Sequence, residues 1–352
     1  MTKATTADPL ASLVYTLDLD PGRWLDRHLR GEVPGRFPYG LDRLAESGFR
    51  VEAEVVRRAG RNPREWIGLV DPRLWLPRQV KPQTGAVIAW DESTAVPMLI
   101  RHGRGDRKLM AGVIWATDAA AANARFSPHL GLLRQVYRHL DAVWVLSRGQ
   151  LPILREWLGV PADRLHFVPL GIDTDFFPER QLPERPMVLS MGNDRDRDPA
   201  TLFEAMRILH SLLPDIRVVV QSRSVSTAPR GIELIRGLSG TEVKGLYAEA
   251  SIVAVATRHN LHVSGMTTAL EAMSMGRPVV LSGTPGAGDY VKDGRTGRLV
   301  LPGDAQAMAD AMVELLSERE MLSTMGSAAA AHVRECHSES SMARRLASIA
   351  IL

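Results

Sequence analysis

The chain has 352 residues, of which 45% are hydrophobic and 24% charged, and its formal net charge is +3. This length exceeds one ordinary domain and suits two, and the composition is typical of a globular protein. Aromatic residues make up only 5% of the chain, which disfavours a base-stacking surface, so no nucleic-acid partner is expected. The single cysteine, Cys336, excludes a disulfide framework and a thiolate metal cluster, and it favours a reducing, cytoplasmic location.

The sequence shows no sign of a membrane-spanning or secretory segment. Its first ten residues are polar and lack the apolar stretch of a signal peptide. The longest apolar runs are strand-sized and too short to cross a bilayer. Basic loops without an amphipathic helix predict at most peripheral membrane contact.

Apolar runs alternate with helical stretches over the first half of the chain. Six runs predict strands, at residues 13–17, 49–56, 85–90, 110–116, 142–146 and 166–170. Helices are expected at residues 41–47, 130–140 and 150–158. Residues 18–40 are rich in Gly, Pro and Arg and predict a long irregular loop. Alternating strands and helices indicate βαβ units and a parallel sheet.

The same alternation restarts after a Pro- and Glu-rich stretch at residues 174–186, which is the best candidate for a linker. Strands are expected at residues 187–191, 216–220, 232–235, 252–255 and 279–281. The sequence therefore predicts an α/β fold with two tandem Rossmann-like, doubly wound domains and a cleft between them. The predicted domains are residues 1–178 and 179–335, and a C-terminal helix at 336–352 is expected to pack back on the first.

One stretch, residues 256–283, carries the strongest functional signal. It predicts a loop, a helix and a buried strand, and the loop holds Ser264, Gly265, Met266, Thr267 and Thr268. The free amides and positive dipole of a helix start favour an anion. Glu271, one turn into the helix, is placed to accept hydrogen bonds from a sugar diol. Together these features predict a site for a nucleotide diphosphate, and the alternative is a Thr-capped helix with Glu271 beside its dipole.

Ligands of open parallel sheets bind outside the carboxyl ends of the strands. The polar residues expected there in the second half are Asn193, Arg195, Arg197, Arg236, Gly237 and Leu238. Arginine binds phosphate oxygens in a bidentate manner. The alternative is that the two loop arginines form surface ion pairs with neighbouring aspartates, which contribute little. In the first half, Asp118 is expected at the end of the strand at 110–116, and its alternative role is to cap a helix.

The second half of the chain resembles the nucleotide-binding domain of the GT-B glycosyltransferases, in particular the retaining family four, called group 1. The matching segments are VPLGIDTDFF (168–177), MGNDRDRDPATLFEAM (191–206), GTEVKGLYAEASIVAVATR (240–258), GMTTALEAMSMGRPVVLS (265–282) and GRTGRLVLPGD (294–304). They occur in one continuous order, which is more specific than any single motif. The resemblance covers residues 168–304, and the chain before Asp118 matches weakly.

The resemblance implies roles for particular residues. Glu271 matches the motif glutamate that holds the ribose diol, residues 265–268 match the backbone that meets the diphosphate, and residues 236–238 lie near the base pocket. Arg197 takes the charge role in the phosphate loop. Val263 replaces the glutamate that contacts the donor sugar, with His262 beside it as a catalytic candidate. The histidine of the family's first domain has no match, and Asp118 is the nearest candidate.

The function that these features imply is that of a metal-independent, retaining glycosyltransferase. It moves a sugar from a nucleotide diphosphate sugar, without a cofactor, to a hydroxyl acceptor that is a glycan, a lipid or a small metabolite. Two alternatives stay open. One is an epimerase or phosphorylase on the same fold, and the other is a non-catalytic member that binds a nucleotide sugar or a partner protein.

Overall fold

The computed structural model describes residues 8–59, 63–122, 127–223 and 225–352, and the chain divides into two compact units. The first unit comprises Met1–Asp26, Arg36–Val168 and Glu339–Leu352, and the second comprises Arg27–Gly35 and Pro169–Ser338. The domain boundaries expected from the sequence, after residues 178 and 335, stay predictions.

The first unit is built on a six-stranded parallel sheet in the order β2-β1-β3-β4-β5-β6. Every strand predicted in this half of the chain is present, with ends that differ by a few residues. The strands are β1 (Leu10–Thr16), β2 (Arg50–Val56), β3 (Gly85–Ala89), β4 (Lys108–Val113), β5 (Ala142–Val145) and β6 (Leu165–Phe167). The strand predicted at 110–116 ends at Val113, because Ala116 already opens a helix.

The α-helices of this part of the chain are α1 (Pro21–Leu29), α2 (Glu92–His102), α3 (Ala116–Ala121), α4 (Pro128–Arg138), α5 (Gln150–Leu158) and α12 (Glu339–Ile351). Of these, α2, α5 and α12 pack against strands of this sheet. The 3₁₀ helices are η1 (Leu17–Leu19), η2 (Pro38–Ser47), η3 (Pro63–Val70), η4 (Pro72–Trp75), η5 (Pro82–Thr84) and η6 (Ala162–Arg164). The helix predicted at 41–47 is therefore part of η2.

Helix α1 corrects the expectation of an irregular loop over residues 18–40. Asp20 accepts a hydrogen bond from the Arg23 amide at 3.0 Å, and Pro21 occupies the first helical position. An aspartate before a proline is a helix start signal, which the many Gly and Pro residues of this stretch concealed.

The C-terminal helix α12 returns to the first unit, as predicted for this fold, and packs against η2. Gly40 permits this contact, because a Cβ at this position would lie 2.2 Å from the Glu339 side chain. The ammonium group of Lys108, at the start of β4, donates to the carbonyl of Ile349 at 3.0 Å.

The second unit also contains a six-stranded parallel sheet, in the order β12-β11-β10-β7-β8-β9. Its strands are β7 (Met187–Met191), β8 (Arg217–Gln221), β9 (Ile232–Ile235), β10 (Ile252–Val255), β11 (Val279–Ser282) and β12 (Gly297–Val300). Numbered from β7, this is the Rossmann order 3-2-1-4-5-6 reversed in direction, with the order switching between β7 and β10.

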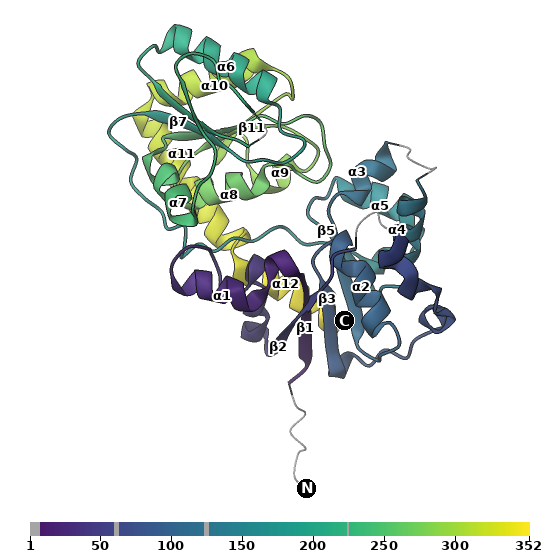
Figure 1. Cartoon of the computed structure of the whole chain (residues 1–352). Coiled ribbons are helices and arrows are strands. Elements are labelled where there is room, and N and C mark those ends of the chain that lie inside the picture. Colours follow the sequence, from purple (N-terminus) through teal and green to yellow (C-terminus); the bar gives the residue numbers. More distant parts are fainter. Residues whose placement is uncertain (1–7, 60–62, 123–126, 224) are drawn as a thin grey trace. The chain divides into compact units, whose positions relative to one another are not determined.

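Helices cover both faces of the second sheet. They are α6 (Pro199–Leu212), α7 (Gly240–Glu249), α8 (Met266–Ser274), α9 (Ala287–Tyr290), α10 (Ala305–Ser317) and α11 (Arg319–Cys336). Helices α6 and α10 pack together on one side of the sheet, and α8 packs with α11 on the other (Figure 1). Because both faces are covered, β7 and β10 are buried along their whole length and read as apolar runs.

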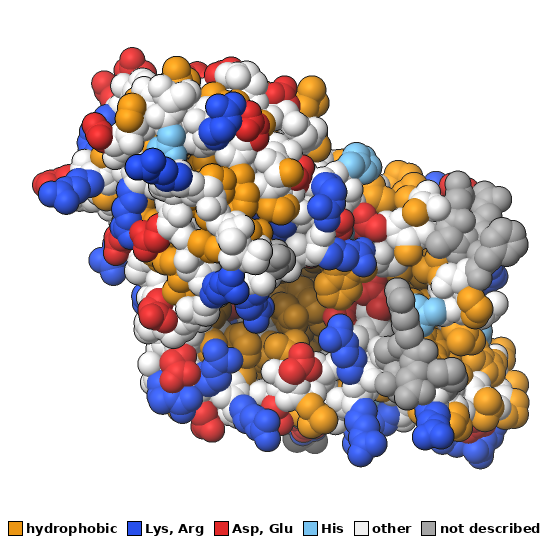
Figure 2. Space-filling model, turned by 45° about the horizontal axis from the view of Figure 1, so that its top comes forward, with side chains coloured by type: hydrophobic (Ala, Val, Ile, Leu, Met, Phe, Trp, Pro, Cys, Tyr) orange, Lys and Arg blue, Asp and Glu red, His pale blue; other side chains and the backbone are white. Residues whose placement is uncertain are grey.

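The face of the molecule in Figure 2 carries side chains of mixed type. Figure 2 shows Lys and Arg side chains interspersed with acidic and hydrophobic ones on the face that it presents. Among the helices of the described residues, none is both long and apolar enough to cross a bilayer.

Candidate functional site

Two loops meet at the switch point of the second sheet, where parallel sheets bind their ligands. The β7–α6 loop is residues 192–198, and the β10–α8 loop is residues 256–265. The amide of Asp198 donates to the carbonyl of Ala256 at 3.0 Å, and the amide of Arg258 donates to the carbonyl of Asp196 at 2.8 Å. Their backbones therefore form a short antiparallel pair, in which Arg197 faces Thr257.

The β10–α8 loop ends at the N-terminus of α8, and among the described residues no side chain forms a cap hydrogen bond at the N-cap of this helix. Its N-cap residue is Gly265, with φ of 88°, a conformation that favours glycine. A Cβ at Gly265 would lie 2.5 Å from a methyl group of Val255. The alternative of a Thr-capped helix is therefore wrong, and the positive end of the helix dipole lacks a side-chain acceptor from its own N-cap.

Arg197 places a second positive charge at this helix end. One guanidinium nitrogen, Nη2, donates to the carbonyl of Met191 at 2.5 Å and to the hydroxyl of Thr268, in the first turn of α8, at 3.1 Å. Its Nε is buried without a hydrogen-bond partner, and no carboxylate of the described residues forms an ion pair with it. Burial lowers the pKa of Arg197 to about 10. A cation at a helix N-terminus is unfavourable by itself, so both groups favour an anion between them.

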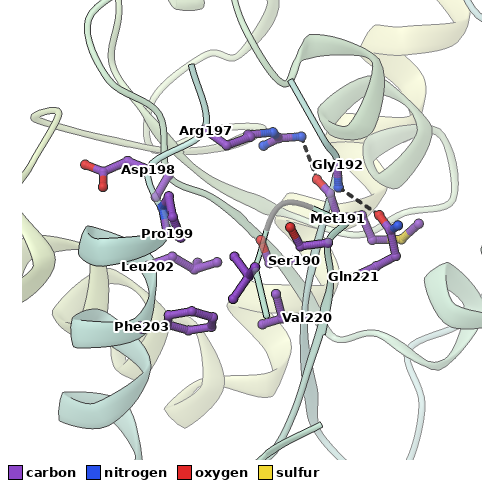
Figure 3. Close-up of a pocket in the computed structure, with 13 residues that line it drawn as sticks. Ser190, Met191, Gly192, Arg197, Asp198, Pro199, Leu202, Phe203, Val220 and Gln221 are labelled. Carbon is purple, nitrogen blue, oxygen red and sulfur yellow. Dashed lines mark hydrogen bonds between the residues drawn. The ribbon is translucent and has the colours of Figure 1, made fainter. Parts of the chain in front are cut away.

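Figure 3 shows the orientation of the Arg197 side chain relative to the start of the β7–α6 loop. The guanidinium reaches back over Gly192, where a Cβ would lie 2.1 Å from Nη2. On the other side of this glycine, the amide of Gly192 donates to Gln221 Oε1 at 3.2 Å. The cavity in Figure 3 lies beneath the loop and has a volume of about 30 Å³, which is room for a single water.

Glu271 lies in the second turn of α8 and does not extend into bulk solvent. Its Oε2 accepts a hydrogen bond from the hydroxyl of Tyr247, on α7, at 2.8 Å. Burial raises the pKa of Glu271 to about 7, against the lowering effect of this hydrogen bond. Oε1 accepts no hydrogen bond from the described residues and is not among the fully buried unpaired atoms. One carboxylate oxygen is thus fixed, and the other is available to a ligand.

The residues predicted near the base lie beyond β9, at the same edge of the sheet. The carbonyl of Arg236 accepts from Gln221 Nε2 at 3.0 Å, and its guanidinium donates to the carbonyl of Ser226 at 2.7 Å. Gly237 is exposed, and Leu238 is half-buried. Gln221 therefore connects this segment with the β7–α6 loop, since its side chain bonds to both.

Two other predicted side chains of the β7–α6 loop point elsewhere. Asn193 Oδ1 accepts from the amide of Arg223 at 2.5 Å. Arg195 is exposed, and its guanidinium lies 3.2 Å from the carboxylate of Asp196. Its geometry is therefore that of a surface ion pair, which was the alternative to phosphate binding. Only Arg197 of this group turns toward α8.

His262 and Ser264 both face Asp194, a residue that sequence reasoning passed over. The hydroxyl of Ser264 lies 2.6 Å and Nε2 of His262 lies 3.3 Å from Asp194 Oδ1. Asp194, Asp196 and His262 bring three potential metal-ligating atoms within 4.8 Å of one another. Since Asp194 Oδ1 already accepts these hydrogen bonds, the cluster is accounted for without an ion. In the sequence, Asp194 is one of several aspartates that alternate with arginines, a pattern that predicts ion pairs between neighbouring residues.

The first unit holds Asp118 in the first turn of α3, rather than at the end of a strand. The preceding loop is fixed by Glu92, whose Oε1 accepts from the amides of Ile114, Trp115 and Ala116 at 3.0, 2.9 and 2.8 Å. Burial raises the pKa of Glu92 to about 7. The catalytic roles of Asp118 and His262 stay predictions.

Comparisons with known proteins identify what the chain is similar to. Residues 187–318 match the family model described as "Glycosyl transferases group 1", which confirms the resemblance inferred from the motifs. A GDP-mannose-dependent alpha-(1-6)-phosphatidylinositol monomannoside mannosyltransferase of Mycolicibacterium smegmatis is 28% identical over 221 residues, which cover 55% of this chain and 58% of that protein. An MMP alpha-(1->4)-mannosyltransferase of Mycolicibacterium hassiacum is 24% identical over 210 residues, which cover 55% and 49%. The chain thus spans about half the length of the curated relatives it matches.

The likeness to solved structures extends over the whole chain. Sucrose-phosphate synthase of Thermosynechococcus elongatus matches with a TM-score of 0.67 and 16% identity, covering 96% of this chain and 98% of that one. This likeness shows the fold alone, which is the GT-B fold with two Rossmann-like domains. The predicted fold class is therefore confirmed.

Proposed function

We propose that this chain, whose residues 187–318 belong to the glycosyl transferases group 1 family, moves a sugar from a nucleotide diphosphate sugar to a hydroxyl acceptor. We propose GDP-mannose as the first donor to test, because the two curated relatives described above are named as mannosyltransferases and one as GDP-mannose-dependent. The acceptor is a glycan, a lipid or a small metabolite, and the reaction takes place in the cytoplasm with retention at the anomeric carbon.

The observation that carries this proposal is the placement of Arg197 against the uncapped N-terminus of α8, with Glu271 one turn further on. An anion is favoured between the guanidinium and the helix end. A diol is favoured at the free oxygen of Glu271, since a carboxylate accepts hydrogen bonds from two neighbouring hydroxyls. A nucleotide diphosphate carries both groups, a pyrophosphate and a ribose diol, at adjacent positions.

The proposed chemistry uses these charges at the moment of bond cleavage. The bond between the anomeric carbon and the diphosphate oxygen breaks, and negative charge grows on the leaving diphosphate. Arg197 and the first amides of α8 are positioned in advance to stabilise this charge, which is the most effective form of electrostatic catalysis. The acceptor oxygen bonds to the anomeric carbon on the same face, and its proton passes to a leaving phosphate oxygen. These cationic groups supply the positive charge that a metal would, so we propose no metal requirement.

A donor screen tests the proposal. The protein is heated with GDP, UDP, TDP and ADP and with the corresponding nucleotide sugars, and its melting temperature is measured. A ligand that binds only the folded state at 100 times its Kd stabilises the fold by about 2.7 kcal/mol, a shift that thermal unfolding resolves. Product analysis with the stabilising donor then identifies the transferred sugar. Indifference to all four diphosphates would refute the assignment.

One observation favours a second candidate, a member that binds the nucleotide sugar without transferring it. Val263, in place of the glutamate that the family resemblance leads one to expect, is buried to 3% exposure and has φ of 55°. A β-branched residue with positive φ is strained, so the packing around Val263 must hold it in this conformation. A buried valine offers no carboxylate to a donor sugar. Turnover with any acceptor would eliminate this candidate. Exchange of solvent hydrogen into the sugar would instead indicate an epimerase.

A further inference from the structure

One carboxylate oxygen of Asp194, in the β7–α6 loop, accepts three hydrogen bonds. Its Oδ1 accepts from the Asp196 amide at 2.9 Å, from the Ser264 hydroxyl at 2.6 Å and from Nε2 of His262 at 3.3 Å. The last two donors belong to the β10–α8 loop. Burial alone would raise the pKa of Asp194, but the hydrogen bonds from His262 and Ser264 hold it well below its usual value. The side chain is therefore a charged connection between the two loops.

The contacts of Asp194 lie where the two loops have no backbone pairing. The backbone pair joins residues 196–198 to residues 256–258, at the base of the loops. Asp194 joins the opposite end, at residues 262–264, immediately before Gly265 and the start of α8. Asn260 supports the same turn, because its Oδ1 accepts from the Ser264 amide at 2.9 Å.

Asp194 also fixes the position of Arg197 along its own loop. The carbonyl of Asp194 accepts the Arg197 amide at 3.1 Å, closing a turn whose side chain then points toward α8. Thus the same residue restrains both partners of the anion site, the guanidinium through its backbone and the helix start through its carboxylate.

We propose that Asp194 is a positioning residue, which sets the distance between the Arg197 guanidinium and the N-terminus of α8 and so determines the affinity of the site for a diphosphate. This inference rests on the proposed function, and it assigns Asp194 no contact with the substrate. Pre-organised charges bind an anion more tightly than charges that must be ordered on binding, because the ordering cost is already met in the free protein.

The test compares three purified full-length variants with the wild type. D194A removes the carboxylate, whereas D194N keeps an acceptor oxygen for Ser264 and the Asp196 amide but loses the charge that faces His262. D304A is the matched control, since Asp304 accepts an amide hydrogen bond from Ala307 at 2.8 Å and caps α10 in the same unit, without contact with either loop. The probes are inorganic pyrophosphate and GDP, and UDP replaces GDP if the wild type binds UDP more tightly. Calorimetry gives Kd, and thermal unfolding gives the melting temperature.

The expected result separates positioning from stability. D194A and D304A should lower the melting temperature to a similar extent, because each loses hydrogen bonds to backbone or side-chain donors. Of these two variants, only D194A should weaken the binding of pyrophosphate and GDP. We expect Kd to rise about tenfold, which is the equivalent of one lost charge-assisted hydrogen bond. D194N should lie between D194A and the wild type. In turnover assays the loss should appear in both KM for the donor and kcat, since the same groups hold the leaving diphosphate.

Other outcomes overturn the inference. If D194A binds pyrophosphate as tightly as the wild type, or if D304A weakens binding equally, Asp194 has no specific positioning role. If D194A does not fold, D194N decides, and an unchanged Kd for D194N then refutes the inference. If the wild type binds neither pyrophosphate nor any nucleoside diphosphate, the proposed function fails as well, which distinguishes the two failures.

Discussion

Replacement of Arg197 by glutamine should separate stability from binding. In the free protein the guanidinium is a buried cation that faces a helix N-terminus, and it forms no ion pair with a carboxylate of the described residues, although the Asp194 carboxylate favours its charged form. Burial lowers its pKa to about 10. At 1.36 kcal/mol for each pKa unit below the usual value, this corresponds to about 3 kcal/mol against the charged form. Glutamine removes that penalty and forfeits two hydrogen bonds of a charged donor, to Met191 and Thr268, at about 1.5 kcal/mol each.

The two effects nearly cancel, so the free energy of unfolding of R197Q should equal that of the wild type to within about 1 kcal/mol, although a buried group has been changed. Diphosphate affinity should instead fall. A hydrogen bond to a charged group contributes about 1.5–3 kcal/mol, so Kd for GDP should rise between tenfold and one hundredfold.

Two measurements check this prediction, urea unfolding for stability and calorimetry with GDP for affinity. R195Q is the control, because Arg195 lies in the same loop but is exposed and paired with Asp196 at 3.2 Å. An exposed ion pair contributes little, so R195Q should change both quantities by less than about 0.5 kcal/mol. Loss of stability in R197Q with unchanged affinity would show that the arginine is a structural group, and the reasoning would then be refuted.

Four further predictions concern the same site. As pH rises through about 7, Glu271 ionises in the folded state, so its hydrogen bonds to a ribose diol should strengthen and the affinity for GDP should increase. The terminal phosphate of GDP titrates in the same pH range. Calorimetry from pH 6 to 8 must therefore show a steeper rise of GDP affinity for the wild type than for E271Q. Because this pKa is raised from 4.5, the contribution of Glu271 to stability is present at acidic pH and lost between about 4.5 and 7, which urea unfolding of both proteins across that range will detect. G265A should lose more stability than G294A by at least about 1 kcal/mol, since both have positive φ but only Gly265 would clash, with Val255 at 2.5 Å; equal losses would exclude packing as the cause. Removal of divalent cations with a chelator should leave the rate of sugar transfer unchanged, and a loss restored by Mg²⁺ or Mn²⁺ would contradict the proposed charge stabilisation by Arg197 and α8.

The parts of the site that the sequence predicts are those with local causes. Gly265 before a run of helix formers indicates a helix start, and Glu271 lies one turn later by spacing alone. The strands of both sheets are apolar runs because they are buried on two faces. Helix α1 was missed although its start signal is local, because Asp20 and Pro21 stand among many other loop-forming residues.

The contacts that the sequence does not predict join residues from different elements. Tyr247 follows the apolar pattern of α7, and nothing in that pattern indicates that its hydroxyl bonds to Glu271, on α8. The alternating Asp-Arg loop suggests ion pairs between neighbours, which is the geometry of Arg195 but not of Arg197. Asp194 bonds across to the β10–α8 loop, a contact that depends on β7 and β10 being adjacent in the sheet.

The two glycines of the site show that its backbone accommodates the arginine. A Cβ at Gly192 would lie 2.1 Å from Nη2 of Arg197, and a Cβ at Gly265 would lie 2.9 Å from Nη1. Both glycines have positive φ, of 123° and 88°, and glycine is costly in conformational entropy. A fold selected for stability alone would fill this space and avoid an unpaired cation at a helix N-terminus. Burial lowers the pKa of Arg197 although the Asp194 carboxylate opposes this effect, so the free protein bears a cost that an anion at this position would offset further, which is the physical reason for placing the diphosphate there.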